Sequence, residues 1–188
     1  VIPRQTHSTN VKVITSSDDI LHLEEVDAVV THLPGFCLCV STADCIPVML
    51  YDKEKQVVAA IHAGWRGTVG RIVEKTIHVM KDIYHTDEKD IIACIGPGIS
   101  LESFEVGDEV YQAFEEAGFD MSLIARKYAK WHIDLWEANR LQLLGLGVKE
   151  EHIEVAGLCT YQSYESFFSA RRMGIRSGRI LSGIMLHK

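Results

Sequence analysis

Three nearly continuous apolar runs lie close together in the first third of the chain, and they constrain its fold more than any other feature. They span residues 36–41, 46–51 and 57–62. Runs of this length are typical of strands that are covered on both faces of a sheet. The polar segment 52–55 separates the last two runs and has the composition of a hairpin turn, so we expect these two strands to pair antiparallel.

Further elements are predicted on either side of these runs. Additional strands are predicted at residues 11–15, 28–31, 91–95, 153–156 and 180–186. From Val69 to Ile83 the apolar residues recur at the spacing of an amphipathic helix, and two more helices are predicted at residues 106–117 and 135–144. The pattern therefore predicts an α+β fold, with one domain over residues 1–188 in which mixed, largely antiparallel sheets are flanked by helices.

The composition argues against several classes of partner. The chain has 188 residues, 47% of them hydrophobic, which is enough to bury a normal core. Lysine and arginine number 19 against 26 acidic residues, a net charge of −7, whereas nucleic-acid binding requires a basic face. No apolar run approaches the roughly 20 residues that span a bilayer. Five cysteines without a regular spacing suit a reducing compartment, so we expect a cytoplasmic protein that binds neither nucleic acid nor membrane.

Two histidines and one cysteine form a candidate metal site. Cys45 and His62 lie at the ends of neighbouring apolar runs, and His7 lies upstream in the segment 4–8. Three protein ligands leave a fourth position for water or substrate, as in catalytic zinc sites. Asp44, beside Cys45, is a candidate partner of a ligand histidine or a proton-transfer group. The spacing alone fits a packed cysteine and a strand-end histidine equally well, so both interpretations stay open.

Two segments are candidates for binding an anion. Arg66 lies in the segment Gly64-Trp65-Arg66-Gly67-Thr68 that leads into a predicted helix, where backbone N–H groups and a guanidinium can face a phosphate. Ser169, Arg171 and Arg172 follow two phenylalanines, a combination that suits an anion beside a stacked base. A tight strand–helix turn and a solvated arginine pair are the structural alternatives.

The remaining thiols are not expected to bind metal. Cys37 and Cys39 point to the same face of a strand, which raises the possibility of a thiolate cluster with Cys45. The usual zinc spacing has two residues between thiols rather than one. We therefore interpret Cys37, Cys39 and the mid-strand Cys94 as packed side chains.

Several motifs, in order along the chain, resemble one family. They are Gln5-Thr6-His7-Ser8, residues 42–48 (TADCIPV), 62–68 (HAGWRGT), 95–100 (IGPGIS), 104–107 (FEVG), 159–160 (CT) and 168–172 (FSARR). The sequence resembles the laccase-domain family, whose members have been called multicopper polyphenol oxidases and later purine nucleoside phosphorylases. In that family further strands precede the Gln5 motif, so we expect N-terminal strands to be absent from this sequence.

The resemblance implies a zinc site of His7, Cys45 and His62 in an α+β fold. It also implies phosphorolysis of adenosine, inosine, guanosine and methylthioadenosine, with adenosine deamination as a further activity. Purine nucleoside and phosphate are then the partners. The sequence does not indicate an oligomeric state.

Two other chemistries remain as alternatives. Two histidines, a cysteine and a methionine also describe a blue-copper site, and Met49 lies close to Cys45, which keeps a copper-dependent polyphenol oxidase as an alternative. Met49 falls inside an apolar run, however, where core packing is the simpler role. A cysteine hydrolase with Cys45 as the nucleophile and a histidine as the base is the other alternative.

Overall fold

A six-stranded mixed sheet forms the centre of the fold. The computed structural model describes residues 1–187, and its strands follow the order β1-β2-β5-β4-β6-β10. These strands are β1 (Val11–Ile14), β2 (Ala28–Thr31), β5 (Val57–Ala63), β4 (Ile46–Asp52), β6 (Ile91–Ile95) and β10 (Ile153–Val155). The predicted β4–β5 hairpin is antiparallel, as are β2–β5 and β4–β6, whereas the outer pairs β1–β2 and β6–β10 are parallel. The predicted mixed α+β fold is confirmed.

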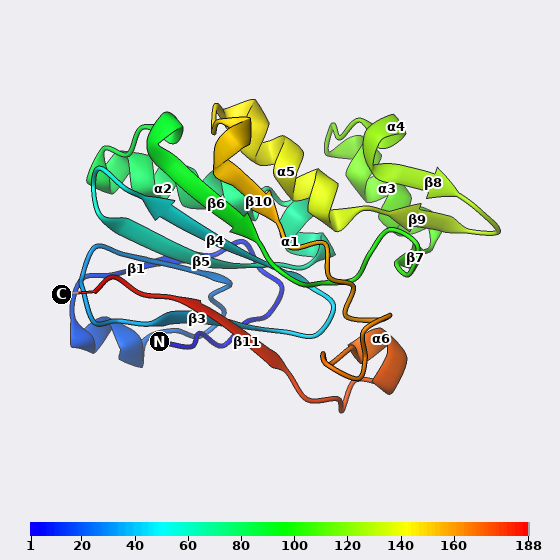
Figure 1. The fold of residues 1–188 in the computed structure, drawn as a ribbon, viewed down its shortest axis with the longest axis horizontal. Coiled ribbons are helices and arrows are strands. Elements are labelled where there is room, and N and C mark those ends of the chain that lie inside the picture. The colour runs from blue at the N-terminus through cyan, green and yellow to red at the C-terminus, as the bar shows by residue number, and fades with distance from the viewer. Residues whose placement is uncertain (188) are drawn as a thin grey trace.

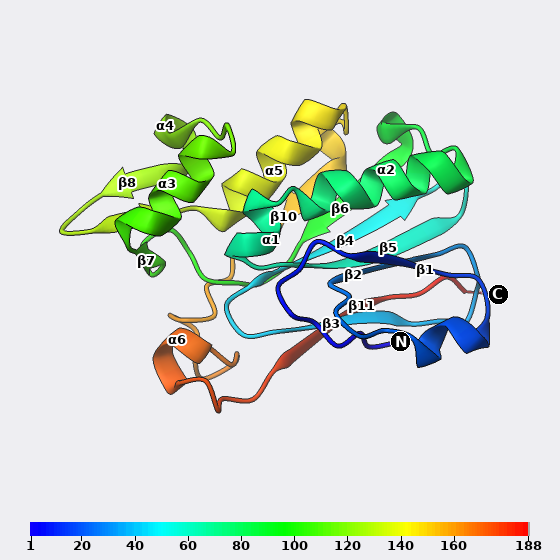
Figure 2. The same cartoon turned by 180° about the vertical axis from the view of Figure 1, so that it is seen from behind.

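The central sheet is covered differently on its two faces. Helices α1 (Trp65–Val69), α2 (Ile72–Tyr84) and α5 (Leu135–Leu146) pack on one face, and a two-stranded sheet of β3 (Leu38–Thr42) and β11 (Ile180–Ile184) packs on part of the other (Figures 1 and 2). One buried cluster lies under the helices and a second lies between the two sheets. This double covering explains why β2 and β5 are buried along their whole length.

The helix predicted from residue 69 onward is interrupted. Gly70 and Arg71 separate α1 from α2, and Arg71 takes the left-handed conformation with φ of 62°. The Arg71 guanidinium donates to the Ala117 carbonyl at 2.7 Å and lies over the Phe119 ring. These tertiary contacts offset the cost of a left-handed arginine, a cost that the apolar periodicity alone does not reveal.

A small third sheet was not predicted. Its strands, in the order β7 (Glu105–Val106), β9 (Trp131–Ile133) and β8 (Ala125–Lys127), have two or three residues each, which is too short for a clear pattern. Because Val106 belongs to β7, the next helix begins at Asp108 rather than at residue 106. The remaining elements are α3 (Asp108–Glu116), α4 (Met121–Ile124), α6 (Ala170–Met173) and the 3₁₀ turns η1 (Ser17–Leu21), η2 (Glu88–Asp90) and η3 (Glu150–His152).

Two of the three thiols interpreted as packed are exposed. β6 buries alternate residues only, so Ile92 and Cys94 face outward where the β3–β11 sheet does not cover β6. Cys37 precedes β3 and is also exposed, whereas Cys39 is buried as predicted. The prediction for Cys37 and Cys94 was therefore wrong, because an apolar run at an incompletely covered strand resembles a fully buried one.

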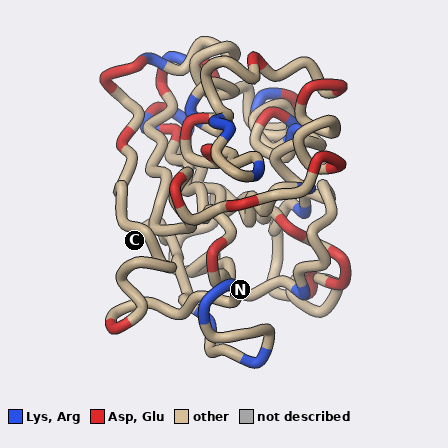
Figure 3. The backbone as a smooth tube through the Cα atoms, turned by 90° about the vertical axis from the view of Figure 1, so that its right-hand side faces the viewer, with Lys and Arg blue, Asp and Glu red and all other residues tan. Residues whose placement is uncertain are grey.

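Charged residues are mixed over the molecule. Figure 3 shows lysines and arginines interspersed with acidic residues in that view. None of the helices among residues 1–187 combines the length and the apolar character needed to cross a membrane.

Candidate metal centre and its cavity

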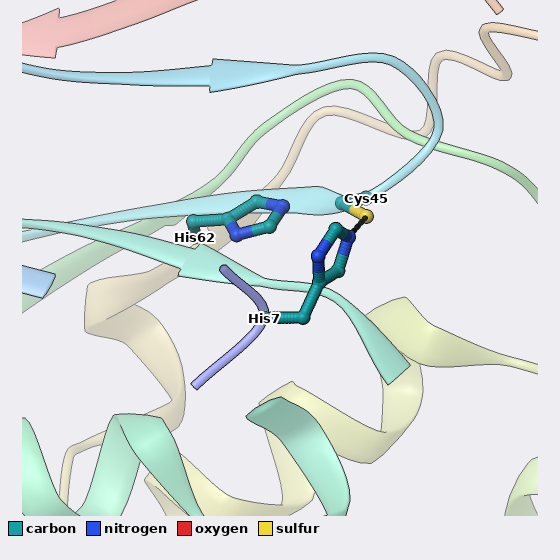
Figure 4. A group of neighbouring side chains, drawn as sticks. All are labelled: His7, Cys45 and His62. Atoms are coloured by element: carbon teal, nitrogen blue, oxygen red, sulfur yellow. Dashed lines mark hydrogen bonds between the residues drawn. The ribbon is translucent and has the colours of Figure 1, made fainter. Parts of the chain in front are cut away.

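Three segments far apart in the sequence bring His7, Cys45 and His62 together. His7 comes from the loop before β1, Cys45 from the turn that leads into β4, and His62 from the end of β5. Their candidate ligand atoms all lie within 4.8 Å of one another (Figure 4), and residues 1–187 contain no other such group of three. The β4–β5 register places Pro47 opposite His62, which brings the turn with Cys45 beside the histidine ring.

Asp27 orients two of these three residues. It is fully buried, and its Oδ1 accepts from Nδ1 of His62 at 2.7 Å and from the backbone N–H of His7 at 3.0 Å. Oδ2 accepts from the backbone N–H groups of Thr6 and Ser8. These bonds hold His7 at its positive φ of 62° and leave Nε2 of His62 free for a ligand. Sequence reasoning missed Asp27, whose only signal is a lone carboxylate directly before the buried strand β2.

Gly64 leaves space for the group. A Cβ at this position would lie 3.0 Å from Sγ of Cys45 and 3.0 Å from Cδ2 of His7. Real Cβ atoms seldom tolerate such contacts, so the glycine in the turn after β5 allows the two ligands to approach the backbone.

The three side chains and Asp27 polarise one another. Burial would raise the pKa of the Cys45 thiol, but hydrogen bonds to the His62 and His7 rings lower this pKa to about 6. Burial would likewise lower the pKa of His62, but its bonds to Asp27 and Cys45 raise that pKa to about 9. Despite its burial, Asp27 has a pKa well below the usual range, because His62 and Ser8 donate to its carboxylate. A thiolate beside an imidazolium is thus favoured in the protein without metal.

The residues fit a metal ion of borderline softness. Zinc bonds of about 2.3 Å to sulfur and 2.0–2.1 Å to nitrogen place two ligand atoms of a tetrahedral site about 3.6 Å apart. Sγ of Cys45 lies 3.8 Å from Nε2 of His7. One thiolate and two imidazoles are ligands that such ions take in proteins, and a carboxylate behind one imidazole commonly orients it. The group can therefore hold a metal, and its geometry leaves one coordination position open.

A cavity of about 570 Å³ opens onto the group, a size that suits a small organic ligand. It is lined by Ile2, Pro3, Gln5, His7, Ser41, Ala43, Cys45, His62, Ala170, Ile175 and Arg179. Within residues 1–187, Arg179 is the only lysine or arginine in this lining. No motif pointed to it in the sequence, where it is simply a basic residue before β11.

The Asp44 carboxylate is held by groups other than the ligand histidines. Its Oδ1 accepts from the Thr160 hydroxyl and its Oδ2 from the backbone N–H of Arg171, each at 2.7 Å. It is buried and has a φ of 87°. Asp44 therefore anchors the start of α6 next to the cavity. The carboxylate that bonds a ligand histidine is Asp27, not Asp44.

None of the other predicted anion residues belongs to the cavity lining. Arg66 is exposed and its guanidinium stacks on the Trp65 ring. It lies in α1, a helix of only five residues that begins directly after Gly64. The Arg171 side chain donates to the Glu105 carbonyl. Arg172 lies over two tyrosine rings, those of Tyr161 and Tyr164. Ser169 is fully buried, and its hydroxyl accepts from the backbone N–H of Arg172 to cap α6.

Comparison with known proteins identifies the family. The sequence model described as "multi-copper polyphenol oxidoreductase laccase" matches residues 1–187. The chain belongs to this family. The resemblance found in the motifs is thereby confirmed.

Named relatives and solved structures agree with this assignment. The chain is 54% identical to a purine nucleoside phosphorylase of Bacteroides thetaiotaomicron, over 100% of this chain and 73% of the relative. It is 45% identical to adenosine deaminase RL5 from an unknown prokaryotic organism, over 98% of this chain and 74% of the relative. The structure of YlmD from Geobacillus stearothermophilus superposes with a TM-score of 0.93 at 32% identity, covering 100% of this chain and 73% of that one. The chain thus spans about three quarters of their length.

Proposed function

We propose that this family member is a zinc-dependent purine nucleoside phosphorylase that acts on adenosine, inosine, guanosine and methylthioadenosine. The observation that carries the proposal is the 54% identity to a protein of that name over the whole chain, together with the His7–Cys45–His62 group at the cavity. In the reaction the bond between the purine and the ribose C1′ breaks, and a bond from C1′ to a phosphate oxygen forms. The products are the free purine base and ribose 1-phosphate, or 5-methylthioribose 1-phosphate when the substrate is methylthioadenosine.

The cavity residues supply binding and orientation. Arg179 in the lining presents a guanidinium suited to phosphate, and Arg66, Arg171, Arg172 and Ser169 stay proposed as substrate or phosphate residues in the surrounding segments. His7, Cys45 and His62 would hold zinc, which when bound supplies a Lewis acid at its open position. Asp27 keeps the His62 ring oriented, and Asp44 is the proposed proton-transfer residue beside the cavity.

Adenosine deamination is proposed as a second activity of the same site. The 45% identity to an adenosine deaminase supports it. Deamination replaces the purine 6-amino group by oxygen from water and releases ammonia, so it requires no phosphate. A site with one open metal position and a neighbouring carboxylate has the groups that such a hydrolysis uses.

Copper oxidase chemistry has less support. The family description names it, but residues 1–187 contain a single group of three His, Cys, Asp or Glu side chains that could hold a metal. Met49, the candidate axial ligand, packs against the core between the two sheets. A multicopper oxidase requires several copper sites, so zinc is the proposed metal and nucleoside chemistry the proposed reaction. The cytoplasmic location and the absence of nucleic-acid and membrane partners stay predictions from the sequence.

The decisive experiment is a product analysis. The zinc-loaded protein is incubated with inosine or adenosine, with and without inorganic phosphate, and the products are separated by chromatography. We expect free base and ribose 1-phosphate only when phosphate is present, and inosine from adenosine in both conditions. Base release that is independent of phosphate would identify a hydrolase. Oxidation of a phenol by the copper-loaded protein without any nucleoside turnover would favour the oxidase.

A further inference from the structure

Cys37 and Cys39 bring two thiols together outside the cavity. Their Sγ atoms lie 3.5 Å apart, and neither residue belongs to the cavity lining. The intervening Leu38 and the following Val40 are fully buried between the sheets. Because side chains alternate along a strand, the two thiols lie on the opposite, outer face of the β3–β11 sheet.

Gly183 in β11 makes room for both sulfurs. It pairs with Cys39 across the strands, and a Cβ at this position would lie 2.8 Å from Sγ of Cys39 and 3.2 Å from Sγ of Cys37. The two sulfurs therefore share the space above one glycine. Cys37 is exposed, so this space is open to an ion from solvent.

The separation of the sulfurs suits chelation better than a disulfide. Two thiolates on one tetrahedral ion, with bonds of about 2.3 Å, lie about 3.8 Å apart. A disulfide requires about 2.05 Å between sulfurs and a Cα separation of at most about 6.8 Å, whereas residues i and i+2 of an extended strand are about 6.6 Å apart. Small side-chain rotations are enough to accommodate an ion. A disulfide would instead form at a Cα separation close to the upper limit for such a bond.

We propose that Cys37 and Cys39 form a second metal site, which chelates a thiophilic ion separately from the His7–Cys45–His62 group. Binding of a divalent ion M²⁺ forms two metal–sulfur bonds and releases two protons, one from each thiol. Met185, the residue directly after β11, is exposed, and its thioether is a soft donor at this end of the β3–β11 pair. The proposal does not depend on the nucleoside chemistry.

Cadmium titration tests the site. Cd²⁺ is added to the zinc-loaded protein while thiolate-to-cadmium charge-transfer absorption, bound cadmium and released zinc are measured. We expect one cadmium per chain with the absorption of two thiolates and without zinc release. The Cys37→Ser/Cys39→Ser variant should lose this cadmium, whereas Cys94→Ser, which removes another exposed thiol, should keep it.

A substitution that keeps both thiols provides a second test. Gly183→Ala places a methyl group against both sulfurs and should weaken cadmium binding about tenfold, which corresponds to about 1.4 kcal/mol. Gly145→Ala is the matched control, because a Cβ there meets nothing within 4 Å. Unchanged cadmium binding in the double serine variant would overturn the proposal. Cadmium uptake that occurs only in exchange for zinc would also overturn it. The same holds if the reduced protein binds no cadmium and oxidised glutathione converts the two thiols to a disulfide.

Discussion

The Asp27 carboxylate accepts a hydrogen bond from Nδ1 of His62 at 2.7 Å and, through the same oxygen, from the backbone N–H of His7. One buried side chain thus fixes the ring of one candidate ligand and the main chain of another. Partners of this kind orient metal-bound imidazoles and set which ring nitrogen is free. Asp27 is therefore the residue through which the folded core determines the geometry of the candidate metal centre.

We predict that Asp27→Asn weakens zinc binding about ten- to a hundredfold, because an amide is a poorer acceptor for the imidazole and cannot receive all of these donors. The buried donors left without a partner should also lower the free energy of unfolding by about 1–3 kcal/mol. Competition with a chromophoric chelator measures the affinity, and thermal unfolding measures the stability. Asp19→Asn is the matched control, since Asp19 accepts from Thr15 and Ser16 and contacts none of the three candidate ligands. Zinc affinity that is equal in the two variants would contradict the role of Asp27.

Elemental analysis after removal of loosely bound ions should give one zinc per chain. Each of the three alanine variants, at His7, Cys45 or His62, should lose this zinc, because the two ligands that remain do not hold the ion. Alkylation adds a second measurement. Iodoacetamide should modify Cys45 faster once zinc is removed, because its pKa of about 6 leaves it a thiolate at neutral pH. Stoichiometric zinc in all three variants would place the metal elsewhere.

Gly64→Ala should weaken zinc binding by about tenfold or more, a change of at least about 1.4 kcal/mol, because its methyl group would displace Cys45 or His7. Gly145→Ala is again the control, and within α5 it should raise stability by up to about 1 kcal/mol. Zinc affinity and thermal unfolding are measured on both. A Gly64→Ala protein with normal zinc affinity would mean that the ligands have more freedom than the structure indicates.

Local sequence patterns predicted the elements that are long and strongly apolar. The β4–β5 hairpin and β2 lie almost at the predicted residues, because a continuous apolar run reflects burial on both faces of a strand. The three-residue strands of the third sheet and the break at Gly70 and Arg71 depend on contacts with distant segments, which no local pattern contains. The exposure of Cys94 likewise depends on how far a different sheet extends.

The candidate site was predictable to a similar degree. His7, Cys45 and His62 were selected by their residue types and strand-end positions, and the fold brings them together. Asp27 and Arg179 escaped notice because their roles arise from packing of remote segments, and neither lies in a recognisable motif. The position of Asp44 beside Cys45 correctly placed it near the site, but it did not predict the hydrogen-bond partners of its carboxylate. Adjacency in sequence does not fix the direction of a side chain.

Asp44 and Thr160 should be energetically coupled. The Thr160 hydroxyl holds the carboxylate that accepts from the Arg171 backbone N–H at the start of α6, so Thr160→Val should raise the KM for nucleoside with little change in kcat. Asp44→Asn should raise KM similarly and in addition lower kcat, the second effect reporting its proposed role in proton transfer. Stability measured in a double-mutant cycle should show a coupling of about 0.5–3 kcal/mol. Identical kinetics in the two variants would reduce Asp44 to an anchor.

Phosphate binding should depend on arginine geometry rather than on charge alone. Arg66→Lys and Arg179→Lys each keep the positive charge but lose the bidentate fork. We expect the apparent phosphate affinity to fall about tenfold in each, or about 1.4 kcal/mol, while zinc content stays unchanged. Adenosine deamination, which uses no phosphate, should lose less activity than phosphorolysis. Arg126→Lys, in β8 of the third sheet, is the control for a general effect of the substitution.

The comparison of the two arginines decides between two locations for the anion. Arg179 lines the cavity, whereas Arg66 stacks on Trp65 outside its lining. A loss of phosphate affinity in Arg179→Lys alone would assign the phosphate to the cavity wall and remove Arg66 from the site. A loss in Arg66→Lys alone would instead require the phosphate to approach from the turn after β5. Equal losses of phosphorolysis and deamination in both variants would mean that the arginines contact the nucleoside or support the fold, and the phosphate would then need other ligands.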